Sequence, residues 1–287
     1  MPFVRDVWIV FVGELQESVR SRRFLVLMGL FLICAVAGTV IFGEIILSME
    51  NNFAVLMGSP ETTKPGVMLD ELVRSAQGKR FVAKMVGDAA IAEEILSMVP
   101  VALFYGWYVL FLLPGGAALA CTATFAAPLG DGSARYELTR TTRGAWCVGK
   151  VLGQWFLVIL GLVVGAVAVL VTAHFTFANL PPVAAAVDLA RVTLMGALVA
   201  FPYVALASAA SLLFRNVAQA TGFAFALLVA LAFARVADRI PWFSDVPAWA
   251  WDLIHALLPA TYETELWHPL SWSQPAAVFL LFSIGAF

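Results

Sequence analysis

Long runs of apolar residues dominate this chain of 287 residues. The first run extends from Phe24 to Gly43 without a single charge. A helix of about 20 apolar residues is long enough to cross the ~30 Å hydrocarbon core of a bilayer. Only 13% of the residues are charged and the mean hydropathy is +0.91, whereas about 25% are charged in an ordinary soluble domain. The sequence therefore predicts an all-α integral membrane protein.

Six apolar runs predict transmembrane helices within one domain, 24–287, and their ends are defined to within several residues. The six runs are 24–47, 101–127, 146–174, 188–214, 216–234 and 275–287. The last run has 13 residues, which as a helix span roughly 20 Å and fall short of the hydrocarbon core. We therefore expect that the natural chain continues past Phe287, or that its end is missing here.

The segment before the first run, 1–23, predicts an amphipathic helix that lies in the membrane interface. Charged residues fall mostly between its apolar ones. The apolar side chains that recur at helical spacing are Val4, Val7, Trp8, Phe11, Val12, Leu15 and Val19.

Cations indicate the orientation of the chain. Arg20, Arg22 and Arg23 directly precede the first run, and positively charged flanks favour the cytoplasmic side. We therefore expect a multi-pass protein of the inner (cytoplasmic) membrane with a cytoplasmic amino terminus. This topology also places the loop 128–145 in the cytoplasm.

Two segments are then extracytoplasmic. Segment 48–99 contains helical patterns and predicts a small helical cap. Segment 235–272 carries five of the nine tryptophans, which prefer the headgroup level, so it predicts an outer interfacial or re-entrant helix around 246–258. Trp249 and Trp251 are candidates for an outer gate, and a simple aromatic belt is the alternative.

A phosphate-loop pattern, GxxxxGK, occurs at Gly144–Val151. Val151 stands where a serine or threonine would hold magnesium, and no predicted strand precedes the pattern. We therefore expect the chain itself to bind no ATP. The net charge of −2 gives no indication of nucleic acid, and we expect no such partner.

Residues suited to catalysis or metal binding are scattered. Glu263, Glu265 and His268 form the only local cluster, and a hydrated loop explains them more simply. We predict no catalytic residue and no metal site, so an integral membrane enzyme is the least favoured class. The histidines and cysteines are His174, His255, His268, Cys34, Cys121 and Cys147.

A polar stretch, DGSARYELTRTTRGAWCVGK, separates the second and third runs at Asp131–Lys150. It is the place where this membrane protein would meet a soluble partner. Its charged side chains are four cations and two acids: Arg135, Arg140, Arg143 and Lys150, with Asp131 and Glu137.

The amphipathic entry segment GELQESVRSRRF at 13–24, the six runs and the loop at 130–153 together resemble the permease subunits of ATP-binding-cassette exporters of type 2. That family carries a Gly-Thr, a short helix, an arginine and then a Gly-Lys that opens the third span. Similar residues stand here in the same order: Gly132 and Ser133, then Arg143, then Gly149 and Lys150. The family's usual proline before the arginine is replaced by Thr141 and Thr142.

The resemblance implies that two permease chains, identical or different, span the bilayer above two ATPase subunits. ATP and magnesium would be held by those subunits, and 128–145 would be the coupling loop. The residues implied for ATPase coupling are Asp131, Glu137, Arg140, Arg143 and Lys150, and those implied to hold the entry helix are Glu14, Arg22 and Arg23. For each arginine, simple anchoring at the cytoplasmic face is the alternative.

Two functions therefore remain open beside the least favoured enzyme. The first is a transport subunit, not itself an enzyme, that exports a hydrophobic or amphiphilic substrate or a polymer. The second is an ATPase-driven membrane anchor that acts mechanically on an extracytoplasmic partner through the cap at 48–99 and passes no cargo.

Overall fold

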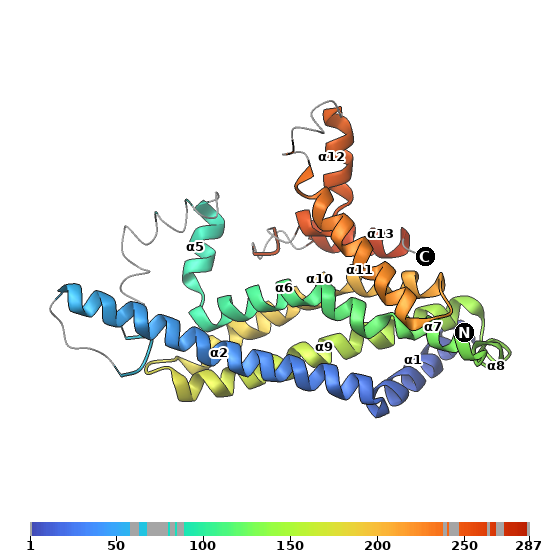
Figure 1. The fold of residues 1–287 in the computed structure, drawn as a ribbon, viewed down its shortest axis with the longest axis horizontal. Coiled ribbons are helices and arrows are strands. Elements are labelled where there is room, and N and C mark those ends of the chain that lie inside the picture. The colour runs from blue at the N-terminus through green and yellow to red at the C-terminus, as the bar shows by residue number, and fades with distance from the viewer. Residues whose placement is uncertain are drawn as a thin grey trace. The chain divides into compact units, whose positions relative to one another are not determined.

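The structure is a computed structural model in which every described element is a helix (Figure 1). No strand occurs in the part of the chain that it describes. The described residues are 2–57, 63–67, 80, 84, 89–237, 240, 247–262, 265–267 and 273–285.

The helices differ greatly in length (Figure 1). The long ones are α2 (Arg22–Met57), α6 (Pro100–Cys121), α9 (Arg143–Thr176), α10 (Pro182–Leu212) and α11 (Val217–Ala234). The shorter ones are α1 (Pro2–Arg20), α5 (Ala89–Ser97), α7 (Ala123–Asp131), α8 (Ala134–Leu138), α12 (Ala248–Leu257) and α13 (Ser273–Gly285), with the 3-10 helices η3 (Pro259–Thr261) and η4 (Glu265–Trp267).

Five helical segments of the described chain are long and apolar enough to cross a membrane, and this confirms the all-α integral membrane class. They are Arg22–Val55, Pro100–Asp131, Arg143–Thr176, Pro182–Leu212 and Val217–Ala234. The sixth predicted run, 275–287, differs from them. Most of it lies in α13, Ser273–Gly285, which is not among these five segments.

Helix ends differ from the predicted limits at the loop 128–145. The second apolar segment remains helical to Asp131, and α9 begins at Arg143 rather than at 146. Hydropathy marks the part of a helix that suits hydrocarbon, whereas backbone hydrogen bonding continues until a residue stops it. Here that residue is Gly132, whose φ of +81° lies in the left-handed region.

The two extracytoplasmic predictions fall only partly on described residues. Within 48–99, α2 continues to Met57, residues 63–67 follow without regular structure, and α5 occupies Ala89–Ser97. Most of the remaining cap lies outside the described residues. Within 235–272, the helix α12 covers most of the predicted 246–258 segment.

The chain divides into two compact units. Unit 1 comprises Met1–Leu27, Phe111–Leu160 and Ala197–Phe287, and unit 2 comprises Met28–Leu110 and Gly161–Gly196. The helices α2, α6, α9 and α10 contribute residues to both units.

Unit 2 satisfies its buried tyrosines through backbone carbonyls. The Tyr105 hydroxyl donates to the carbonyl oxygen of Leu162 at 2.6 Å, and the Tyr108 hydroxyl donates to that of Phe31 at 2.9 Å. A hydroxyl without a partner would be costly in an apolar interior. These bonds therefore join α6 to α9 and to α2.

Polar contacts also hold the non-helical part of unit 2. The Ala178 amide donates to the carbonyl oxygen of Pro65 at 3.1 Å, and the Gly66 amide donates to the carboxylate of the buried Glu50 at 3.1 Å. Segment 63–67 is thereby fixed against α2 and against the chain that follows α9.

Unit 1 packs small residues where its helices approach closely. Ala118, Ala210 and Ala224 form a buried cluster of α6, α10 and α11. The Gly130 backbone is close to the chain after α10, because a Cβ at this position would lie 2.4 Å from the carbonyl oxygen of Arg215. Only glycine fits there without a shift of the backbone.

Candidate functional site

The polar stretch between α7 and α9 is an ordered helical turn of unit 1. Gly132 ends α7 in the left-handed conformation, which glycine adopts at little cost. The Ser133 amide then donates to the Asp131 carboxylate at 2.9 Å, and α8 follows as a five-residue helix. The Thr139 hydroxyl closes α8 by donating to the carbonyl oxygen of Tyr136 at 2.7 Å.

A threonine rather than a proline directly precedes α9, which begins at Arg143. The Thr142 hydroxyl accepts from the Ala145 amide at 3.3 Å, which is the bond of an N-cap residue. One turn into the helix, the Trp146 ring packs edge-on against Phe125 of α7 with 4.9 Å between the ring centroids. The Trp146 indole N–H donates to the Glu137 carboxylate, so α8 is bonded to the start of α9.

Lys150 is the centre of the site. It is only 4% exposed, and its ammonium donates to Oε2 of Glu14 at 2.8 Å. The same nitrogen lies 3.6 Å from Oε2 of Glu137 and 5.6 Å from the centroid of the Trp146 ring. Lys150 on α9 thus contacts a carboxylate of α1 and a carboxylate of α8.

Gln154 completes the bonding of Glu14. Its amide nitrogen donates to Oε1 of Glu14 at 2.6 Å and lies 3.2 Å from the Ser18 hydroxyl. Both carboxylate oxygens of this buried residue therefore have a donor. A buried charge requires such compensation, because the loss of its hydration is costly.

Two glycines bring the backbones of α1 and α9 together. A Cβ at Gly149 would lie 2.7 Å from Cβ of Val10 and 2.9 Å from the carbonyl oxygen of Val7, and one at Gly153 would lie 3.0 Å from Cγ of Glu14. Residues four apart occupy the same helix face, and small residues at this spacing permit close helix packing in membranes. The close approach places Glu14 within reach of Lys150.

The structure brings three of the predicted residues together, namely Glu14, Glu137 and Lys150. Arg140 and Arg143 are exposed. Asp131 is also exposed and accepts the Ser133 amide. The roles assigned to these five coupling-loop residues and to Glu14 stay predictions.

The other predicted residues make different contacts. Arg22 is exposed, whereas the Arg23 guanidinium donates to the carbonyl oxygen of Leu119 on α6. Trp249 is 68% exposed on α12. Trp251, on the same helix, has its ring 6.3 Å from that of His255.

Sequence reasoning missed Trp146, Gly153 and Gln154. The signal for the last two was present as a spacing, because Gly149 and Gly153 recur four residues apart, as do Lys150 and Gln154. When glycines and polar residues each recur four residues apart in the first turns of an apolar helix, they indicate close packing against another helix that carries polar side chains.

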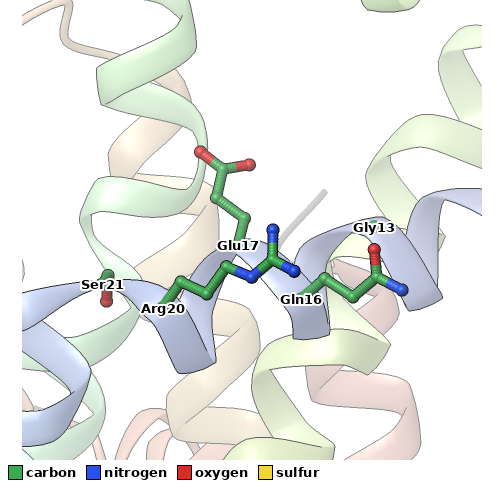
Figure 2. A pocket seen from close by; sticks show the side chains of 5 residues that line it. All are labelled: Gly13, Gln16, Glu17, Arg20 and Ser21. Atoms are coloured by element: carbon green, nitrogen blue, oxygen red, sulfur yellow. The ribbon is translucent and has the colours of Figure 1, made fainter.

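A separate open pocket of about 520 Å³ lies along α1 (Figure 2). Its lining residues come from α1 and from the residue that joins α1 to α2. They are Gly13, Gln16, Glu17, Arg20 and Ser21. None of the residues predicted for coupling lines this pocket.

These features define a multi-pass membrane protein with a buried polar cluster where its second and third membrane helices are joined. The family model for ABC-2 family transporter protein matches residues 8–236. The chain therefore belongs to the ABC-2 transporter family and is a permease subunit, as the loop motif predicted. No individually curated protein matches the chain. The matched range contains the whole Glu14–Lys150 cluster, and α12 lies beyond it.

Proposed function

We propose that this chain is the permease subunit of an ATP-driven exporter, with ATP and magnesium held by a separate ATPase subunit. The family match supports a transport role and implies an ATP-binding partner. Cations before the first span and in the loop support a cytoplasmic amino terminus in the inner membrane. The ATPase subunit would then bind at the loop between α7 and α9.

The contact of Lys150 with both Glu14 and Glu137 carries the proposal. Glu14 and Lys150 form a buried pair that joins α1 to the first turns of α9. Glu137 of α8, whose side chain is 37% exposed, adds a contact from α8 to the same lysine. Separating a buried ion pair leaves a charge without compensation, and removal of one partner typically costs about 3–5 kcal/mol. A displacement of α9 would therefore move α1 with it, and α8 is tied to α9 by the contacts of Glu137 with Lys150 and Trp146.

The mechanism assigns different roles to the charged residues. Glu14, Glu137 and Lys150 position the helices, while the exposed Arg140 and Arg143 contact the ATPase subunit. The apolar spans carry the motion into the bilayer. Their low content of charged side chains fits a hydrophobic or amphiphilic substrate, which would move outward between this chain and a second permease chain.

The test is to co-express the chain with its cognate ATPase subunit, purify the complex through a tag on the permease and reconstitute it in lipid nanodiscs. We expect stoichiometric co-purification and vanadate-sensitive ATP hydrolysis that falls when Arg140 and Arg143 are both changed to alanine. An ATPase variant without its phosphate-loop lysine is the control for background hydrolysis. A permease that purifies without any ATPase would overturn the proposal.

The same complex distinguishes cargo transport from mechanical action on an external partner. Export predicts that substrate stimulates hydrolysis in nanodiscs that contain only the permease and ATPase subunits. Mechanical action predicts loss of activity, with intact assembly, when the segment 58–88 is replaced by a short flexible linker.

A further inference from the structure

Tyr136 on α8 is unusually exposed for a large side chain. Its exposed fraction is 78%, the highest among the large hydrophobic residues of the described chain. Exposed aromatic residues within the spans can face lipid, but Tyr136 lies between the apolar segments that end at Asp131 and begin at Arg143. It belongs to the polar stretch, where a soluble partner would be met.

The neighbouring residue fixes the direction of Tyr136. Glu137 accepts the Trp146 indole N–H and lies 3.6 Å from the Lys150 ammonium, so this side of α8 faces the protein. Successive residues on an α-helix are rotated by about 100°, which turns Tyr136 away from that side. The bond from Thr139 to the Tyr136 carbonyl also holds its backbone. The phenol is therefore presented outward by a helix with a fixed rotation.

Two exposed cations flank Tyr136 in the sequence. Arg135 and Arg140 are exposed on either side of it along the chain. Glu137, the acid of α8, is engaged by Trp146 and Lys150. The exposed surface of α8 and of the turn after it thus offers one aromatic ring and two cations. Tyrosine and arginine are among the residue types that most often dominate binding energy at interfaces.

We propose that Tyr136 is the anchor of the ATPase interface and inserts into an apolar slot of that subunit whose rim is acidic and meets Arg135 and Arg140. This inference rests on the proposed function and names the chemistry of its partner. A protein slot fits the position better than a lipid surface does. A residue of an aromatic belt lies at the end of a span, whereas Tyr136 is separated from both spans by the turns at 132–133 and 139–142.

Binding is the first measurement. The full-length permease, in nanodiscs, is immobilised and the purified ATPase subunit is passed over it at several salt concentrations. We expect Tyr136→Ala to weaken binding by about 30-fold, as loss of an interface anchor does, and Tyr136→Phe to stay within about threefold because it keeps the ring. Val183→Ala is the matched control, since Val183 is 77% exposed in unit 2.

The dependence of binding on salt concentration tests whether the rim of the slot is acidic. Replacing Arg135 and Arg140 together by glutamine should slow association and flatten the dependence of binding on salt, because exposed charges act mainly on the association rate. Thermal unfolding of each permease variant alone should match the wild type, since these side chains are exposed. Unchanged salt dependence would remove the acidic rim from the proposal.

Photo-crosslinking identifies the molecule that lies against Tyr136. With p-benzoylphenylalanine at position 136, we expect a crosslink to the ATPase subunit, and with the same group at position 183 we expect none. A crosslink to lipid alone, or Tyr136→Ala binding as tightly as wild type, overturns this inference. If even the wild-type chain fails to bind the ATPase subunit, the proposed function itself fails, so the two outcomes are distinguishable.

Discussion

Glu14 on α1 and Lys150 on α9 form a buried ion pair, with 2.8 Å between Oε2 and Nζ. Their side chains are only 7% and 5% exposed. The lysine that closes the family's loop motif thus faces another helix of the same chain. This relationship divides the charged residues of the loop into an inward set, which holds helices, and an outward set around α8, which is available to a partner.

The first prediction concerns this ion pair. Lys150→Met keeps the length of the side chain but leaves the Glu14 carboxylate buried without its cation. We expect a loss of about 3–5 kcal/mol in the free energy of unfolding, measured by denaturation of the permease in detergent micelles. Adding Glu14→Gln should recover part of the loss, because the uncompensated charge is then removed.

Arg143→Met is the matched control for that experiment. Arg143 is also a cation in the first turns of α9, but it is exposed. Exposed ion pairs contribute about 0–1 kcal/mol to the free energy of unfolding. Equal losses for the Lys150 and Arg143 variants would contradict the buried pair.

The second prediction concerns the close packing of α1 on α9. In Gly149→Ala the new Cβ would lie 2.7 Å from Val10 and 2.9 Å from a backbone oxygen, so α1 must move away. We expect faster hydrogen exchange of the α1 amides, measured by mass spectrometry. Gly13→Ala is the control on α1 itself, because its Cβ meets no atom within 4 Å and the change should be neutral or stabilising. Equal exchange in the two variants would mean that α1 is not packed on Gly149.

Hydropathy and charge predicted the membrane helices and the polar loop, because a bilayer selects for segment length and composition. The motif around Gly132 and Lys150 predicted the family. The direction in which Lys150 points was not predictable, because a cation after a loop has the same pattern whether it faces solvent or a buried carboxylate. The partner, Glu14, is 136 positions away along the chain, and only the packing of α1 on α9 shows the pairing.

The helix limits show a second reason for the differences. Hydropathy placed the start of the last run at residue 275, whereas α13 begins two residues earlier, at Ser273. Conversely, α7 continues to Asp131 because its end depends on the left-handed Gly132 and not on where the apolar residues cease.

The third prediction concerns unit 2. The Asp188 carboxylate accepts the Val99 amide at 2.8 Å, directly before the first residue of α6. Asp188→Ala removes this acceptor, and we expect a loss of about 1.5–3 kcal/mol with faster hydrogen exchange in the first turn of α6. Asp188→Asn keeps an oxygen acceptor and should lose less. Asp252→Ala, at an exposed acid of α12, is the control, and an equal loss there would count against the Asp188 contact.

The fourth prediction concerns Gly132, which turns the chain from α7 into α8. Its φ of +81° costs an alanine roughly 1–2 kcal/mol, whereas asparagine tolerates this conformation better. With Gly132→Ala, relief of the strain would rotate α8 and move Tyr136 and Arg140 away from the ATPase subunit. We therefore expect Gly132→Ala to reduce co-purification of the ATPase and the ATP hydrolysis of the nanodisc complex, with Gly132→Asn intermediate.

Gly116→Ala is the control for the Gly132 series, because it places a methyl group in α6 where no atom lies within 4 Å. It should leave both readouts at the wild-type level. The order of the variants in these two readouts is the informative result. Because the position needs a left-handed conformation, we expect the highest values with glycine, intermediate values with asparagine and the lowest with alanine. Full activity in Gly132→Ala would show that the orientation of α8 does not depend on this turn, and coupling would then have to rely on the bonds of Glu137 alone.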